Sequence, residues 1–252
     1  MHPLLLSAAS LCAATVFGSL IGFFIKELPH KWNDTVLGYC AGIMLAASTV
    51  GLILPGFEGR GTMHWLFVGI SVMVGAWFLN LLDVITPHLH HITGLDPEQH
   101  RANGRISHIL LFVMAIALHK FPEGMAAGVS LNGGVAGSTD WTVTLGISIQ
   151  NIPEGMVVIA PLLLAGVSRL RTFCIAVAIG LLEVVGVAMG YFLANVSQAF
   201  LPLLLAFAGG AMLYVTSDEM IPETHAHGSE TGATYALLAG FCVMLVSDFF
   251  LG

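Results

Sequence analysis

Charge is the property that this sequence lacks most. Only 9% of the 252 residues are Asp, Glu, Lys or Arg, whereas an ordinary globular domain carries roughly 25%. Hydrophobic residues make up 56% of the chain, so the few charges could not cover the surface of a water-soluble fold of this size. The composition therefore nearly excludes a soluble enzyme and indicates a protein whose apolar surface faces lipid.

Basic residues and paired cysteines are also scarce. Eight Lys and Arg against fifteen Asp and Glu give a net charge of −7, which excludes the positive surface that nucleic-acid binding requires. The cysteines stand singly in apolar stretches without a CxxC spacing, so neither a disulfide framework nor a thiolate metal site is predicted. Packing is the interpretation favoured for all four: Cys12, Cys40, Cys174 and Cys242.

Long apolar runs are what the sequence has instead. A bilayer-crossing helix needs about 20 mainly apolar residues, and eight stretches separated by Gly, Pro or polar residues meet this requirement. No Lys or Arg precedes the first stretch, so we expect a true span there rather than a signal peptide. The predicted spans are 4–25, 36–54, 63–82, 106–131, 141–167, 172–194, 200–217 and 233–251.

The basic residues indicate an orientation, because short cytoplasmic loops collect Lys and Arg. Six of them follow spans one, three and five, and only Arg60 lies in a loop of the opposite parity. Both termini are therefore predicted to lie outside the cytoplasm. With no linker between soluble domains, residues 1–252 are expected to form one transmembrane domain, with a mobile cytoplasmic loop at about 83–105 that holds His88, His90, His91 and His100.

A short motif recurs in two spans. Pro-Glu-Gly-Met occurs at 122–125 in span four and at 153–156 in span five, a spacing of 31 residues. Because consecutive spans run antiparallel, the repeat predicts a pseudo-two-fold axis in the membrane plane, with the two glutamates facing each other. Each proline removes a backbone donor, so both helices are predicted to be broken at mid-membrane, where transporters place their sites.

The residues around the motif suit a divalent metal. His119 and Glu123 lie four residues apart on one helix face, and Gln150 and Glu154 repeat this spacing. An isolated PEG is more often a kink, and a lone histidine is more often a packed residue. Two copies of the motif, the histidine and Glu183, which is the one charge in span six, together favour a functional site at mid-membrane.

At these residues the chain resembles the ZIP (Zrt- and Irt-like protein) family of divalent metal transporters, and within it the bacterial members. The likeness covers essentially the whole chain, and segments 42–48 and 219–225 are similar to the family's remaining signatures. The resemblance implies an all-α polytopic fold of eight transmembrane helices. It also implies a transporter rather than an enzyme, located in the bacterial inner membrane.

The resemblance further implies a substrate and its ligands. The substrate would be Zn²⁺, and variably iron, manganese or cadmium, carried toward the cytoplasm as one helix bundle moves against another. Zinc is favoured because imidazole and carboxylate suit it, and the absence of a nearby thiolate argues against a soft-metal site. The main ligands implied are His119, Glu123, Gln150 and Glu154, with Met44 nearby.

The chain departs from the family pattern at an adjacent second site, which Lys120, Asn151 and Glu183 would build. The family frequently has Asn at position 120, and Asn151 stands where a carboxylate could occur. The three glutamates, Glu123, Glu154 and Glu183, against one protonated lysine leave a charge of −2 for one divalent cation. We therefore expect one metal per protomer, with the Lys120 ammonium where a second cation could bind. Proton coupling through Lys120 and a simple Lys120–Glu183 ion pair both stay open.

Two further groups of residues are predicted on the cytoplasmic, release side. They could receive the ion as it leaves or report cytoplasmic metal, or they are incidental residues of hydrated segments. The groups are His88, His90 and His91 in the loop, and Glu219, Glu223, His225 and His227 after span seven.

Other functions remain alternatives. A metal-dependent membrane hydrolase is disfavoured because no HExxH motif occurs. A passive channel could use the same ligands along a continuous pore, and an exporter could use the same site under a different gradient. Small residues in the spans permit close helix packing and leave a homodimer open.

Overall fold

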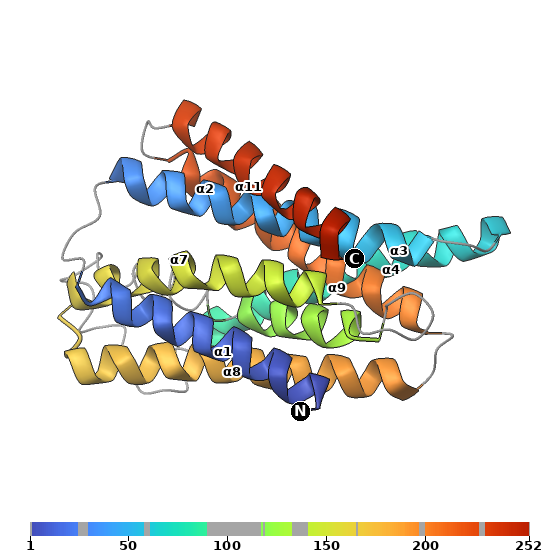
Figure 1. Cartoon of the computed structure of the whole chain (residues 1–252), viewed down its shortest axis with the longest axis horizontal. Helices are drawn as coiled ribbons and strands as arrows, with labels where there is room; N and C mark the ends of the chain where they lie inside the picture. Colours follow the sequence, from blue (N-terminus) through green and yellow to red (C-terminus); the bar gives the residue numbers. More distant parts are fainter. Residues whose placement is uncertain are drawn as a thin grey trace.

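The computed structural model describes residues 2–24, 30–57, 61–89, 117, 119–132, 141–164, 166–196, 200–226 and 230–251. Every regular element in these ranges is helical. The helices run lengthwise beside one another (Figure 1). This arrangement confirms the all-α fold class that the apolar runs predict.

Within the described ranges, six helical runs are long and apolar enough to cross a membrane. Four are unbroken helices, namely α1 (Pro3–Gly22), α4 (Gly61–Leu89), α8 (Arg169–Val196) and α11 (Glu230–Leu251). Two are composite. One joins α2 (His30–Ala46), η1 (Ala47–Ile53) and α3 (Leu54–Phe57), and the other joins α9 (Leu201–Val215), η3 (Thr216–Met220) and α10 (Ile221–Thr224).

The fourth and fifth predicted spans correspond to the helical segment 119–130 and to α7 (Thr142–Leu164). With 23 residues, α7 is about 35 Å long at 1.5 Å per residue, enough to cross a hydrocarbon core of about 30 Å. Residues 106–116 of the fourth span lie outside the described part of the chain. Eight spans therefore stay a prediction. The start of α1 and the end of α11 lie toward the same end of the molecule (Figure 1), as an even number of crossings requires.

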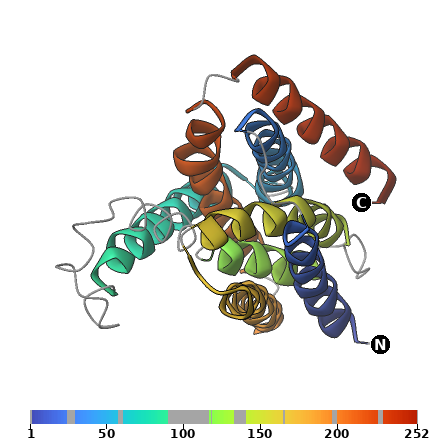
Figure 2. The same ribbon diagram turned by 90° about the vertical axis from the view of Figure 1, so that its left-hand side faces the viewer.

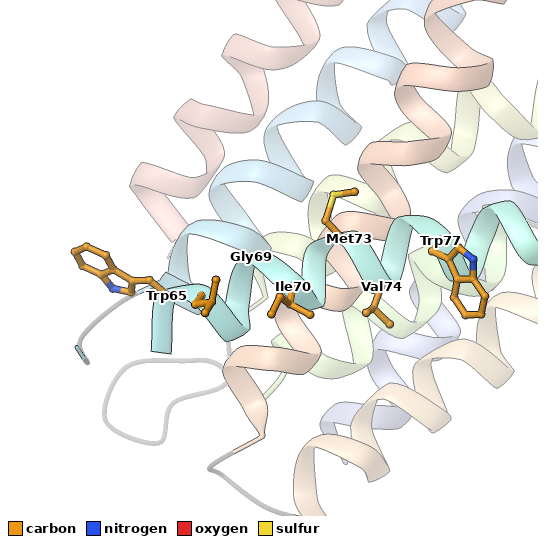
Figure 3. Close-up of a pocket in the computed structure, with 7 residues that line it drawn as sticks. Trp65, Gly69, Ile70, Met73, Val74 and Trp77 are labelled. Carbon is orange, nitrogen blue, oxygen red and sulfur yellow. The ribbon is translucent and has the colours of Figure 1, made fainter. Parts of the chain in front are cut away.

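Apolar side chains on the outside of the molecule fit a lipid environment. On α4 the outward face carries Trp65, Ile70, Met73 and Trp77, each at least half exposed, around Gly69 (Figure 3). A water-soluble protein rarely exposes so large an apolar surface. The six apolar helices and this exposed face together support a multi-pass membrane protein.

The two PEG prolines do not break their helices, so this prediction is wrong for the described residues. α7 runs without interruption through Pro153, and segment 119–130 is helical on both sides of Pro122. A proline frees one carbonyl, and a membrane helix can absorb that loss through small local adjustments without ending. The irregular turns are the π-helical stretches η1 and η3, each of which ends two residues before a proline.

Two helices are longer than the sequence predicts. α4 continues to Leu89 rather than ending at residue 82, since 83–86 contains no Gly or Pro and Pro87 falls in the last turn. The backbone of His88 is therefore helical, and His90, His91 and His100 lie outside the described residues. Predicted span seven, 200–217, continues through η3 and α10 to Thr224.

Close backbone contacts divide the helices into two bundles. In the site bundle, α1 packs on α7, and segment 119–130 packs on α8. In the second bundle, α2 packs on α11 and α4 packs on α9. At each pair a glycine lets the backbones meet, because an added Cβ would lie 1.9 to 2.1 Å from a carbonyl oxygen of the partner helix: Gly18, Gly124, Gly42 and Gly75.

The bundles meet each other through side chains instead. Gly51 of η1 faces Cγ2 of Val143 on α7, and Gly146 of α7 faces Sδ of Met244 on α11. Among the described glycines, none has a backbone atom of the other bundle as its nearest neighbour. In the end view, α7 and the green segment 119–130 lie near the centre of the molecule (Figure 2), which places the PEG motifs beside the boundary between the bundles.

Candidate functional site

A buried lysine stands at the centre of the polar residues. Lys120 is 1% exposed, and its Nζ donates to Glu123 Oε2 at 2.6 Å, to Glu154 Oε2 at 2.6 Å and to Asn151 Oδ1 at 2.5 Å. An ammonium group has three donors, so each finds an acceptor. Because one turn separates Lys120 from Glu123, and another separates Asn151 from Glu154, two facing helices can surround a single cation.

The network continues to α8 and α1. Asn151 Nδ2 donates to Glu183 Oε1 at 2.7 Å, and Thr15 Oγ1 donates to Glu183 Oε2 at 3.1 Å. The oxygen of the Asn151 amide therefore accepts from Lys120 while its nitrogen donates to Glu183. Asn151 thus connects Lys120 to Glu183. The sequence leaves a direct ion pair between these two residues open.

One amide oxygen and one carboxylate oxygen of this network accept no hydrogen bond from the described residues. Gln150 Nε2 donates to Glu123 Oε1 at 3.0 Å. Gln150 Oε1 and Glu154 Oε1 are buried and accept no hydrogen bond from the part of the chain that the structure describes. A buried acceptor without a donor is costly, and a cation that binds there would remove this cost. Met44 of α2 is also buried, at 1% exposure.

His119 lies against the second bundle. Its Nε2 is 2.9 Å from Glu219 Oε2 on η3. Across the described ranges, no three His, Cys, Asp or Glu side chains form a group that could hold a metal ion. The carboxylates of Glu123 and Glu154 bind the Lys120 ammonium, and His119 Nε2 lies beside Glu219 without a hydrogen bond to any described residue. A metal would take the remaining oxygens or replace these bonds.

The residues predicted on the release side separate into two groups. Glu219 belongs to η3 and contacts His119 of the core rather than standing after the helix. His225 binds other partners, with Nδ1 2.9 Å from the Ile221 carbonyl oxygen and Nε2 3.2 Å from Thr234 Oγ1 of α11. Glu223 is on α10. His227, His90 and His91 lie outside the described residues, as does the side chain of His88.

Three side-chain contacts of the site are not predicted from the sequence. The sequence contains a signal for Glu219, because residues 212–221 have no Gly or Pro. This predicts a helix that continues past residue 217 and includes Glu219. Thr15 gives no signal, because nothing in the sequence relates α1 to Glu183. Cys40 of α2 donates its Sγ hydrogen to the Gln150 carbonyl oxygen at 3.7 Å, so a thiol lies at the site where none was expected.

Comparison with known proteins decides the family. A family model described as ZIP zinc transporter matches residues 93–248. The zinc transporter GufA of Myxococcus xanthus is 40% identical over 254 residues, covering 97% of this chain and 98% of the relative. The chain belongs to the ZIP family. The zinc transporter ZIPB of Bordetella bronchiseptica is 38% identical over 259 residues, covering 98% of this chain and 81% of that ZIP relative.

Membership of the ZIP family confirms the resemblance carried by the motifs. The matched residues include both PEG motifs, Glu183 and the segment 219–225. ZIP proteins are transporters, so the membrane hydrolase is set aside. A third relative, the zinc transporter ZupT of Chlorobaculum parvum, is 30% identical over 254 residues, covering 93% of this chain and 92% of the relative.

Proposed function

We propose that this protein carries divalent metal ions, with zinc the main substrate, across the bacterial inner membrane toward the cytoplasm. The observation that carries the proposal is the buried network of Lys120 with Glu123, Glu154 and Glu183 between otherwise apolar helices. Ionisable residues at membrane depth mark ion pathways. The names of the relatives, which are zinc transporters, support zinc.

One metal per protomer follows from the charges of this network. Glu123, Glu154 and Glu183 against the Lys120 ammonium amount to −2, which one divalent ion neutralises. A second divalent ion would leave a buried excess of positive charge, which is costly without further anions. The Lys120 ammonium bonds to both PEG glutamates and to Asn151. It takes the place that a second metal ion would have.

A carrier with moving bundles is favoured over a channel. Backbone contacts at glycines make each bundle a rigid unit, and the side-chain contacts between bundles are the ones that can change at least cost. The described side chains around Lys120 and Glu154 enclose a space too narrow for a water molecule, unlike the continuous wet path that conduction requires.

The contact of His119 with Glu219 couples metal binding to this movement. It joins segment 119–130 of the site bundle to η3 of the second bundle. If His119 binds the metal through Nε2, that nitrogen is no longer available to Glu219. Metal loading and release of one link between the bundles then become the same event. The basic-residue distribution supports both termini outside the cytoplasm, and the lack of a linker between soluble domains supports a single domain over 1–252.

Radiolabelled zinc uptake into proteoliposomes tests the proposal. Purified wild type is expected to take up zinc saturably, and His119→Ala and Glu154→Ala are expected to lower uptake to the background of empty vesicles, since each loses a ligand. Glu230→Ala, on the exposed first turn of α11, is the control and should match wild type. Folded wild type that moves neither zinc, iron nor manganese would contradict transport. Uptake that rises linearly with zinc concentration would contradict the carrier and favour a channel.

A further inference from the structure

Cys40 is a buried thiol at the boundary between the bundles. It lies on α2 of the second bundle, is 0% exposed, and its Sγ is 3.7 Å from the Gln150 carbonyl oxygen on α7 of the site bundle. The side chain of Gln150 in turn bonds Glu123. The thiol therefore stands one residue from the polar network, and the function proposed above leaves it without a role.

A second sulfur lies on the same side of α2. Met44 follows Cys40 by four residues, so the two side chains lie one above the other on one helix face. Both are almost fully buried, at 0% and 1% exposure. A thiol and a thioether thus stand together on the second bundle where it faces α7.

Unsatisfied oxygens stand on the facing helix. Gln150 Oε1 and Glu154 Oε1 on α7 are buried and accept no hydrogen bond from the described residues. The two sulfur atoms on α2 and the two free oxygen acceptors on α7 therefore belong to facing helices, which the contact of Cys40 with the Gln150 carbonyl joins.

We propose that Cys40 is a further metal-contacting residue of the transport site, and that with Met44 it makes the site favour the thiophilic ions Cd²⁺ and Zn²⁺ over Mn²⁺. The proposal rests on the transport function above and deepens it. Cysteine binds metal as a thiolate, so one proton leaves Sγ for water as the sulfur–metal bond forms. Sulfur ligands select softer ions, whereas carboxylate and carbonyl oxygens also suit Mn²⁺.

The position of Cys40 makes its contribution depend on the conformation. The PEG glutamates and Gln150 belong to the site bundle, whereas Cys40 and Met44 belong to α2 of the second bundle. A metal held by both would join the two bundles, and movement of one against the other would separate it from the sulfur atoms. The site then favours soft ions only while α2 of the second bundle contacts α7 of the site bundle, as it does here.

Cadmium binding tests the contact without transport. A protein with Cys12→Ser, Cys174→Ser and Cys242→Ser keeps Cys40 as its single cysteine. In detergent with Cd²⁺, we expect an ultraviolet sulfur-to-cadmium charge-transfer band, which a further Cys40→Ser substitution removes. A folded single-cysteine protein that binds Cd²⁺ in equilibrium dialysis without this band would overturn the proposal.

Metal competition in proteoliposomes tests the selectivity. For Cys40→Ser we expect the apparent KM for Cd²⁺ and Zn²⁺ to rise by at least about tenfold relative to that for Mn²⁺, since losing even an outer partner of a metal costs that much. Cys174→Ser, on an exposed position of α8, is the control and should keep the wild-type ratio. If Cys40→Ser does not fold, Cys40→Ala and Met44→Leu provide the same comparison. An unchanged ratio overturns the proposal while transport stands, whereas a wild type that moves no metal at all overturns the transport function.

Discussion

Replacing Lys120 with asparagine is expected to make the folded state of this protein depend on metal. In the wild type the Lys120 ammonium binds Glu123 and Glu154, and all three residues are buried. Removing one partner of a buried ion pair leaves uncompensated charge and costs about 3–5 kcal/mol. Without metal, Lys120→Asn should therefore unfold at a clearly lower temperature in detergent than wild type.

Zinc is expected to reverse this loss in Lys120→Asn. With the lysine gone, the carboxylates of Glu123, Glu154 and Glu183 leave −3 for bound cations, and a second divalent ion can occupy the position of the ammonium. Equilibrium dialysis should give two bound zinc ions per Lys120→Asn chain, against one for wild type, and zinc should raise the unfolding temperature of the variant more than that of wild type.

The matched control is Lys31→Asn. Lys31 is an exposed lysine on α2, so its replacement should change neither the metal-free stability nor the zinc count. Adding Asn151→Asp to Lys120→Asn supplies a fourth carboxylate and should tighten the second zinc further. A Lys120→Asn protein that is as stable as wild type without metal, and still binds one zinc, would contradict the role given to Lys120.

The chemistry of the site could be predicted from local spacing. The PEG repeat identifies Glu123 and Glu154, and the i, i+4 spacing adds His119 and Gln150, because these relations hold on any helix. The partners of each residue could not be predicted in this way. Whether His119 meets a metal or Glu219 depends on how segment 119–130 lies against η3, which is more than 85 residues further along the chain.

The shape of the helices was harder to predict than their existence. A proline predicts a weak point, but whether the helix breaks depends on neighbours that can satisfy the freed carbonyl. Thus Pro153 lies inside an unbroken α7, while the widened turns of η1 and η3 precede Pro55 and Pro222. The sequence predicts only packing for Cys40 for a similar reason, since only the tertiary contact brings its thiol to Gln150.

Gly42→Ala is expected to destabilise the second bundle severely, because the glycine is where two backbones meet. A Cβ at Gly42 would lie 1.9 Å from the Leu237 carbonyl oxygen of α11. Backbone cannot rotate away as a side chain can, so the helices must separate along their contact. Overpacking costs about 1–3 kcal/mol and occasionally more, and we expect a loss of about 3 kcal/mol, seen as a lower unfolding temperature and a reduced monodisperse fraction in detergent.

Gly69→Ala is the control that isolates this effect. Gly69 lies on the outward face of α4 between Trp65 and Met73 (Figure 3), and an added Cβ there would meet nothing within 4 Å. The same substitution should change stability by no more than about 1 kcal/mol, the difference in helix propensity between Gly and Ala. Because the two variants differ in contact and not in chemistry, equal stability would mean that the backbone contacts do not hold α2 to α11. The rigid bundles of the proposed carrier would then lose their physical basis.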